Sequence, residues 1–183
     1  MYSILSLAKE GEIKLPHLFK NSLQGDSVCA KLFSTLGVST TSTKDGIILN
    51  KINQTENKFE YDFLNCPDIA QTLAVCCAAK NVEANLKGLQ TLSIKETDRI
   101  VALKTELGRF GVETITSSDS LQINSKFKAQ NLKIESYIDH RMAMSFAPLA
   151  LICNTIEIQN PNVVEKSFPH FWEELKNIGF IIR

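Results

Sequence analysis

The amino-acid sequence predicts an α/β (α+β) fold in which one unit of roughly 70 residues occurs three times. The first observation is a set of three amphipathic helix patterns that each end in a glycine. The second is a set of helix patterns that begin at an aspartate and lie between the first ones. The third is a series of short alternating strand patterns between the helices. Because this period exceeds that of stacked solenoid repeats, we expect a pseudo-threefold arrangement within one domain.

The glycine-terminated helices are predicted over residues 28–36, 100–110 and 168–178. Apolar residues fall on one helical face in each case, as in Ile100, Leu103, Leu107 and Phe110, and in Phe168, Phe171, Trp172, Leu175 and Ile178. Gly37, Gly111 and Gly179 follow these helices, and intervals of 74 and 68 residues separate them. A glycine at this place suits the left-handed residue that ends many helices.

Two strand pairs are predicted after the first two of these helices. One runs from Ser39 to Leu49 through the turn residues Lys44–Gly46, and the other runs from Glu113 to Ile123 through Ser117–Asp119. Both segments alternate apolar and polar residues around a short polar turn, which is typical of a β-hairpin.

The second set of helices begins at Asp68, with Pro67 in its first turn, and at Asp139. Apolar residues recur at helical spacing after each aspartate, and a strand pattern follows at residues 82–86 and 156–158. An interval of 27 residues leads from Asp68 to Lys95, and the same interval leads from Asp139 to Lys166. The two segments therefore read as copies of one unit.

Composition excludes several classes of function. The 183 residues include 20 Lys and Arg against 20 Asp and Glu, so no net positive charge points to nucleic acid or to an anionic membrane surface. No run of 18 apolar residues is present, and the first residues lack the basic start of a secretory signal, so we expect a cytoplasmic protein. The five cysteines and three histidines show no spacing typical of a disulfide framework or a metal site.

Polar clusters precede or open several predicted helices, where free backbone N–H groups favour anions. They are Lys95-Glu96-Thr97-Asp98-Arg99, Asp139-His140-Arg141, Lys166-Ser167 and the single Asp68. Each also has a simpler explanation. Thr97 could be a helix cap with solvated charges around it, both aspartates could be ordinary helix-start acids, Lys166 could be a surface lysine, and His140 could have a structural role. The recurrence of cations at matched places in the repeats favours an anion site.

Four of these segments carry a resemblance to a known family. Asn65-Cys66-Pro67-Asp68, Lys95–Arg99, Asp139-His140-Arg141-Met142-Ala143-Met144 and Lys166-Ser167-Phe168-Pro169 occur in the order and spacing of the C-terminal portion of the EPSP synthases (3-phosphoshikimate 1-carboxyvinyltransferases). Asn21-Ser22-Leu23-Gln24-Gly25-Asp26 is also similar to that family. The resemblance covers nearly the whole chain.

The resemblance implies a fold and a domain organisation. The family consists of two-domain enzymes, and each domain is an inside-out α/β barrel of three βαβαββ-like units with helices inside and sheets outside. Residues 1–183 are then expected to form the C-terminal domain alone. The N-terminal domain, and a short N-terminal segment that completes the C-terminal domain, are expected to lie outside this chain, which would then be inactive by itself.

The resemblance also implies a reaction, the transfer of the enolpyruvyl group of phosphoenolpyruvate to the 5-hydroxyl of shikimate 3-phosphate. Asp68 and Glu96 would be the catalytic acid–base groups, and Asp68 and Lys95 would contact shikimate 3-phosphate. Arg99, Arg141 and Lys166 would bind phosphoenolpyruvate. Some family members have an asparagine that contacts shikimate 3-phosphate where this chain has Thr91, so that contact is not expected here.

No metal or organic cofactor is implied, and the expected partners are the two substrates and the N-terminal half of a monomeric enzyme. Two alternatives stay open. The chain could belong to another enolpyruvyl transferase of the same fold, or it could be a non-catalytic module that binds anions.

Overall fold

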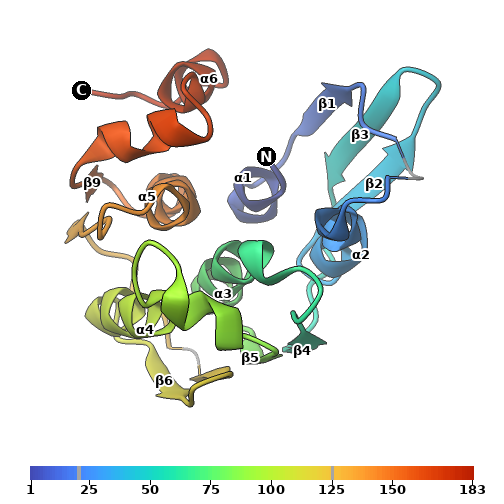
Figure 1. Ribbon diagram of the computed structural model, residues 1–183. Coiled ribbons are helices and arrows are strands. Elements are labelled where there is room, and N and C mark those ends of the chain that lie inside the picture. The colour runs from blue at the N-terminus through green and yellow to red at the C-terminus, as the bar shows by residue number, and fades with distance from the viewer. Residues whose placement is uncertain (20–21, 125) are drawn as a thin grey trace.

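The computed structural model describes residues 1–19, 22–124 and 126–183, in which helices and strands alternate (Figure 1). The α-helices are α1 (Tyr2–Leu7), α2 (Cys29–Ser34), α3 (Ala70–Ala79), α4 (Arg99–Arg109), α5 (His140–Phe146) and α6 (Phe171–Asn177). The strands are β1 (Glu12–Pro16), β2 (Val38–Ser42), β3 (Gly46–Lys51), β4 (Lys58–Asp62), β5 (Glu83–Lys87), β6 (Glu113–Thr116), β7 (Leu121–Asn124), β8 (Leu132–Ile134) and β9 (Ile156–Ile158). Short 3-10 helices are η1 (Gly25–Val28), η2 (Pro67–Ile69), η3 (Gln90–Ile94), η4 (Ala147–Leu151) and η5 (Pro161–Lys166).

The middle of the chain shows the repeating unit in full. Its elements follow one another as β4, α3, β5, α4, β6 and β7, and its sheet has the strand order β4-β5-β7-β6. β4 and β5 are parallel, as a strand–helix–strand connection requires, and β7 is antiparallel to both β5 and β6. This is the βαβαββ unit that the resemblance implies.

The segments on either side repeat parts of this unit. The sheet β1-β3-β2 has the order of β5-β7-β6, with the central strand again antiparallel to both neighbours. β8 and β9 are parallel like β4 and β5, and α5 connects them as α3 connects β4 and β5. The threefold repeat predicted from the glycines and aspartates is therefore present in the structure.

The helices lie inside and the sheets lie outside, as Figure 1 shows. α3 is the central helix, because it contacts α1, α4 and α5 and nearly every residue from Ala70 to Ala78 is buried. Its sequence is apolar on all sides, which fits a helix surrounded by other helices. β5 and β7 alternate buried residues with more exposed ones, so one face of their sheet packs on the helices and the other is solvated.

The three glycines have the left-handed backbone that the sequence predicts. The φ angles of Gly37, Gly111 and Gly179 are 86°, 76° and 101°. Beyond Gly111, the N–H of Val112 donates to the carbonyl of Leu107 at 3.2 Å, which closes the last turn of α4. A side chain at Gly37 would also place its Cβ 2.9 Å from the carbonyl oxygen of Ile52. These positions therefore accept glycine far more readily than other residues.

Proline explains where two of the predicted helical segments depart from a regular α-helix. α6 begins at Phe171 rather than at Phe168, because the residue before Pro169 is disfavoured in helical conformation. The helix that begins after Asp139 is α-helical only to Phe146 and continues as η4. Pro148 has no N–H to donate one turn back, so the regular hydrogen-bond ladder cannot run through it.

The cap of α4 also differs from the simpler explanation considered for its polar cluster. Asp98, not Thr97, is the N-cap, and its Oδ1 accepts from the N–H groups of Ile100 and Val101 at 3.1 Å each. Asp68 lies in the 3-10 turn before α3 and has no capping role there. An aspartate directly before the first helical residue reaches the free N–H groups of that turn, and Thr97 lies one residue too early.

All five cysteines are free thiols, in agreement with the absence of a disulfide pattern in the sequence. Within the described ranges, no helix is long and apolar enough to cross a membrane. Asn21, the first residue of the segment 21–26 in the family resemblance, lies outside the described residues.

Two consecutive residues before α5 have an uncommon backbone conformation. Tyr137 and Ile138 both have a φ of 54°, in the left-handed region that a β-branched residue rarely adopts. The side chain of Ile138 buries little surface in return, since the residue is 74% exposed. The segment directly before Asp139 is therefore strained.

Replacing Ile138 with asparagine should stabilise the chain by about 1 kcal/mol, because asparagine tolerates the left-handed region and little apolar contact is lost. Urea unfolding followed by circular dichroism measures the change. Ile94→Asn is the matched control, since Ile94 is 81% exposed and has no positive φ. An equal gain in both variants would show that backbone strain is not the cause.

Candidate functional site

The centre of the candidate site is Arg99, the first residue of α4. Its side chain is only 2% exposed and lies among three carboxylates. Nε and Nη2 donate to the two carboxylate oxygens of Asp139 at 2.7 and 3.3 Å. Nη2 also donates to Glu96 at 2.7 Å, and Nη1 donates to Asp68 at 3.3 Å. A planar guanidinium suits this arrangement because its fork can serve several oxygens at once.

Asp139 has two roles in the structure. Its carboxylate accepts from the backbone N–H of Arg141 at 2.7 Å and that of Met142 at 3.4 Å, so it caps α5. The same carboxylate receives Arg99, and Asp139 is completely buried. Because a buried charge is costly unless it is paired, Arg99 and Asp139 require each other.

Asp68 connects two further cations to this centre. Nη1 of Arg141 donates to the backbone carbonyl of Asp68 at 2.8 Å, and Nη2 donates to its carboxylate at 3.0 Å. Lys95 lies 3.5 Å from the same carboxylate. The side chains of these residues are about one third exposed, so this part of the cluster faces solvent.

Glu96 connects the centre to the C-terminal part of the chain. Lys166, at the end of η5, donates to its carboxylate at 2.7 Å, and Arg99 donates to the other oxygen. The hydrogen bond from Lys166 is the main cause that lowers the pKa of Glu96 to about 2. Nδ1 of His140 lies 3.8 Å from the same carboxylate, and burial lowers the pKa of this imidazole. Glu96 is therefore ionised near neutral pH in this state.

The charges of the cluster nearly cancel. Its four cations are Lys95, Arg99, Arg141 and Lys166, and its three carboxylates are Asp68, Glu96 and Asp139. A multiply charged anion could bind here by taking over cations from Asp68 and Glu96, which are more exposed than Asp139. A carboxylate that loses its cation would gain a proton more readily. The cluster can thus couple anion binding to acid–base chemistry.

The structure brings all six predicted site residues together, from the second and third repeats of the chain. Sequence reasoning missed two contributors, because Asp139 was considered only as a helix-start acid and His140 only as a structural residue. The signal for Asp139 was its place beside His140 and Arg141, at the position in its repeat that Asp68 has in the preceding one. The hydroxyl of Thr91 is buried without a hydrogen-bond partner in the described structure.

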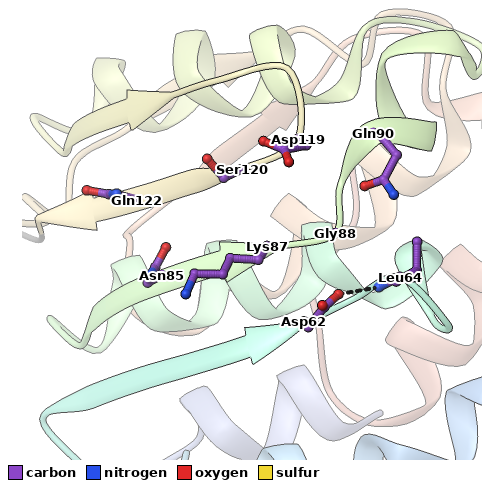
Figure 2. Close-up of a pocket in the computed structure, with 9 residues that line it drawn as sticks. All are labelled: Asp62, Leu64, Asn85, Lys87, Gly88, Gln90, Asp119, Ser120 and Gln122. Carbon is purple, nitrogen blue, oxygen red and sulfur yellow. Dashed lines mark hydrogen bonds between the residues drawn. The ribbon is translucent and has the colours of Figure 1, made fainter.

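A hollow of about 440 Å³ lies elsewhere on the described part of the chain. Figure 2 shows that its polar lining comes from the ends of β4 and β5, from β7 and from the residues next to them. Asn85 and Lys87 line it and alternate with the buried Ala84 and Leu86, so the hollow is on the outer face of the sheet. The Asp62 carboxylate is occupied by the N–H of Leu64. None of the six predicted residues lines this hollow.

Among the described side chains, no three His, Cys, Asp or Glu are arranged to hold a metal.

Comparison with known sequences relates the chain to one enzyme family. Residues 1–175 match the sequence model of EPSP synthase (3-phosphoshikimate 1-carboxyvinyltransferase). The chain is 44% identical, over its full length, to 45% of the 3-phosphoshikimate 1-carboxyvinyltransferase of Bacteroides fragilis. It is 33% identical, over 97% of its length, to 41% of the protein of that name from Haemophilus influenzae strain PittGG. The chain thus spans less than half the length of these relatives.

Solved structures show the same fold. The whole chain superposes on 45% of an EPSP synthase from Acinetobacter baumannii with a TM-score of 0.77 and 22% identity. It also superposes on 42% of the enolpyruvyl transferase NikO from Streptomyces tendae with a TM-score of 0.68 and 14% identity. The predicted fold class is confirmed by these similarities together with the repeating unit described above.

Replacing Asp139 with asparagine should lower the free energy of unfolding by about 3 kcal/mol, because Arg99 would lose its buried partner. Asparagine keeps the oxygen that caps α5, so the loss reports the ion pair rather than the cap. Chemical denaturation measures it. Asp98→Asn changes an exposed cap of α4 in the same way and should shift stability by less than about 0.5 kcal/mol. Similar losses in both variants would contradict a special role for the Arg99 pair.

The stability that Glu96 contributes should depend on pH. Its pKa in the folded chain lies below its ordinary value, so the contribution is present above an ordinary glutamate pKa and is lost as pH falls toward about 2. Lys166→Met removes the main cause of this shift and should cost up to about 1 kcal/mol at pH 6, since the lysine is largely exposed. The difference from the unmodified chain should shrink between pH 5 and pH 3, measured by urea unfolding. Lys104→Met, at an exposed position of α4, is the control. A difference that is independent of pH would contradict the coupling.

Proposed function

The chain belongs to the EPSP synthase family, and we propose that it forms one wall of an active site that transfers the enolpyruvyl group of phosphoenolpyruvate to the 5-hydroxyl of shikimate 3-phosphate. The observation that carries this proposal is the charged cluster around Arg99. It gathers four cations and two partly exposed carboxylates from the second and third repeats. These are the groups that a doubly anionic substrate and a proton-transfer reaction need.

Residues 1–183 are proposed to act as the C-terminal domain of a two-domain enzyme. The N-terminal domain would supply further contacts to both substrates and close over this surface, which would exclude water from the reacting groups. The chain alone is then expected to be folded but inactive. We further propose that the complete enzyme is a cytoplasmic monomer and that it needs no metal or organic cofactor.

The cations are proposed to divide between the two substrates. Phosphoenolpyruvate carries a carboxylate and a phosphate, which the guanidinium groups of Arg99 and Arg141 and the ammonium of Lys166 would bind. Asp139 binds Nε and Nη2 of Arg99, which form the inner edge of the guanidinium. The outer Nη1 is therefore the atom available for a substrate. Lys95 would contact shikimate 3-phosphate together with Asp68, which it already approaches in this structure.

The acid–base steps follow from the chemistry of addition and elimination. In the addition, the 5-hydroxyl oxygen bonds to C2 of phosphoenolpyruvate and loses its proton, while the methylene carbon gains one. In the elimination, that carbon gives up a proton, the double bond re-forms and the phosphate leaves C2. Asp68 is proposed to accept the hydroxyl proton, and Glu96 is proposed to handle the proton at the methylene carbon.

Binding of phosphoenolpyruvate would prepare Glu96 for this role. In the unliganded chain the hydrogen bond from Lys166 keeps its carboxylate ionised, so it has no proton to give. When the substrate takes Lys166, Glu96 loses this cation and comes close to new negative charge. Both changes raise the pKa of a carboxyl group. The proton donor is thus formed when the substrate arrives.

A chimera tests the proposed function. This chain would replace the matching 45% of the Bacteroides fragilis enzyme, and phosphate release from phosphoenolpyruvate and shikimate 3-phosphate would be measured. We expect turnover by the chimera and none by the 183-residue chain alone, because the two domains share the substrates. Asp68→Asn in the chimera should lower kcat by at least about 100-fold, as for the loss of an acid–base group.

Asp119→Asn is the matched control, since this exposed acid lines the hollow of Figure 2 and should leave kcat within twofold of the unmodified chimera. Cooperative unfolding of each protein shows that it is folded. A folded chimera that releases no phosphate would overturn the proposed reaction, and turnover by the chain alone would overturn the division of the site between two domains. Turnover only with an acceptor other than shikimate 3-phosphate would assign a different enolpyruvyl transfer.

A further inference from the structure

The strained turn before α5 leads directly into the residue that holds Arg99. Tyr137 and Ile138 have left-handed backbones, and the next residue is Asp139, whose carboxylate pairs with Arg99. The N–H of Asp139 donates to the carbonyl of Ser136 at 2.9 Å across these two residues, as in a β-turn. Two adjacent non-glycine residues in this conformation also need contacts from the surrounding structure. The contacts of this turn are therefore informative.

Tyr137 is held at both its side chain and its backbone. Its hydroxyl donates to Oε1 of Glu106 at 3.0 Å, and its N–H donates to Oε1 of Glu135 at 3.1 Å. Burial, together with the hydrogen bond to Glu106, raises the pKa of Tyr137 to about 12, so the hydroxyl keeps its proton and remains a donor. Glu106 is itself only 1% exposed and also accepts from Arg109 at 3.1 Å.

Two side chains of α4 therefore bind the turn. Arg99 and Glu106 are seven residues apart on this helix, which is close to two helical turns, so both side chains lie on one face. Arg99 binds Asp139 near the start of the helix, and Glu106 binds Tyr137 two turns later. The two contacts enclose Tyr137, Ile138 and Asp139, which include both strained residues.

We propose that Glu106 and Tyr137 are positioning residues that set the orientation of Arg99 for phosphoenolpyruvate. The hydrogen bond between them keeps the turn in its left-handed form, and this form presents the Asp139 carboxylate to the inner edge of Arg99. The outer Nη1 then faces the solvent side of the cluster, where Asp68 meets it in the unliganded chain. The role in substrate binding rests on the proposed function, whereas the effect on Arg99 does not.

Without the hydrogen bond, the backbone of Tyr137 and Ile138 would relax toward the regions that ordinary residues prefer. The carboxylate of Asp139 would shift with it, since only one peptide unit separates Ile138 from Asp139. Arg99 would then lose its fixed inner edge while remaining near Glu96 and Asp68. The result would be a misaligned guanidinium in a folded protein.

The first experiment uses the 183-residue chain and does not depend on activity. In Tyr137→Phe, the Nε–H proton of Arg99 should exchange with solvent about tenfold faster, measured by NMR, because its hydrogen bond to Asp139 opens more often. Tyr2→Phe is the matched control, because it removes a part-buried tyrosine hydrogen bond of 3.0 Å to Thr40, in the first repeat. Equal Arg99 exchange in Tyr137→Phe and the unmodified chain would overturn the proposal.

The second experiment uses the chimera and tests the consequence for the substrate. Tyr137→Phe should raise KM for phosphoenolpyruvate by about tenfold and change KM for shikimate 3-phosphate by less than about twofold. Glu106→Met removes the acceptor of the Tyr137 hydroxyl and should have a similar effect, and the double variant should be no worse than either single one. A purely structural role predicts lower thermal stability without this selective change, and that result would overturn the positioning role.

Ile138→Asn supplies a rescue. Asparagine accepts the left-handed backbone, so the turn would need the hydrogen bond from Tyr137 much less. Adding Ile138→Asn to Tyr137→Phe should restore most of the Arg99 exchange protection and of the KM for phosphoenolpyruvate. Failure of this rescue would show that Tyr137 does not act through the strained turn. A folded but inactive chimera would remove the proposed function and leave the exchange experiment to decide the effect on Arg99.

Discussion

The buried ion pair between Arg99 and Asp139 is the interaction on which the site depends. It joins the first turn of α4, in the second repeat, to the cap of α5, in the third. Both side chains are out of solvent, so the loss of either one would leave the other as a buried, unpaired charge. The pair therefore fixes how two repeats meet, and Glu96 and Asp68 are arranged around the guanidinium that it holds.

The remaining charges of the cluster are paired with one another. Lys166 donates to Glu96, and Arg141 donates to Asp68. An anion that binds these cations would have to take the place of the two carboxylates. These pairs are more exposed than Arg99 and Asp139, so they are weaker and can be exchanged. On a surface of this kind, an anion could replace the carboxylates as the partner of Lys166 and Arg141, while the buried pair of Arg99 and Asp139 stays in place.

Much of this arrangement follows from the sequence because it obeys local rules. Helical spacing, the glycines after the helices and the aspartate spacing predicted the repeats. Matched cations favoured an anion site, and the family resemblance implied which six residues form it. The start of α6 was misplaced because Pro169 acts on the residue before it. The second role of Asp139, its pairing with Arg99, depends on a contact across 40 residues that no local pattern encodes. The left-handed Ile138 was equally hidden, since a β-branched residue gives no reason to expect that conformation.

The two aspartates before α3 and α5, the first α-helices of the second and third units, show how a repeated structure can become an asymmetric site. Asp68 and Asp139 occupy equivalent places, each 27 residues before a lysine of the cluster. Asp139 is fully buried and has become the anchor of Arg99, whereas the side chain of Asp68 is 34% exposed and faces the lysine and arginine side chains at the surface. Burial separates their environments, because the Asp139 carboxylate is enclosed with the Arg99 guanidinium, while a partly exposed carboxylate can exchange partners. The repeat supplies matched positions, and the difference in burial makes one of them the partner of Arg99 and leaves the other at the solvent-facing side of the cluster.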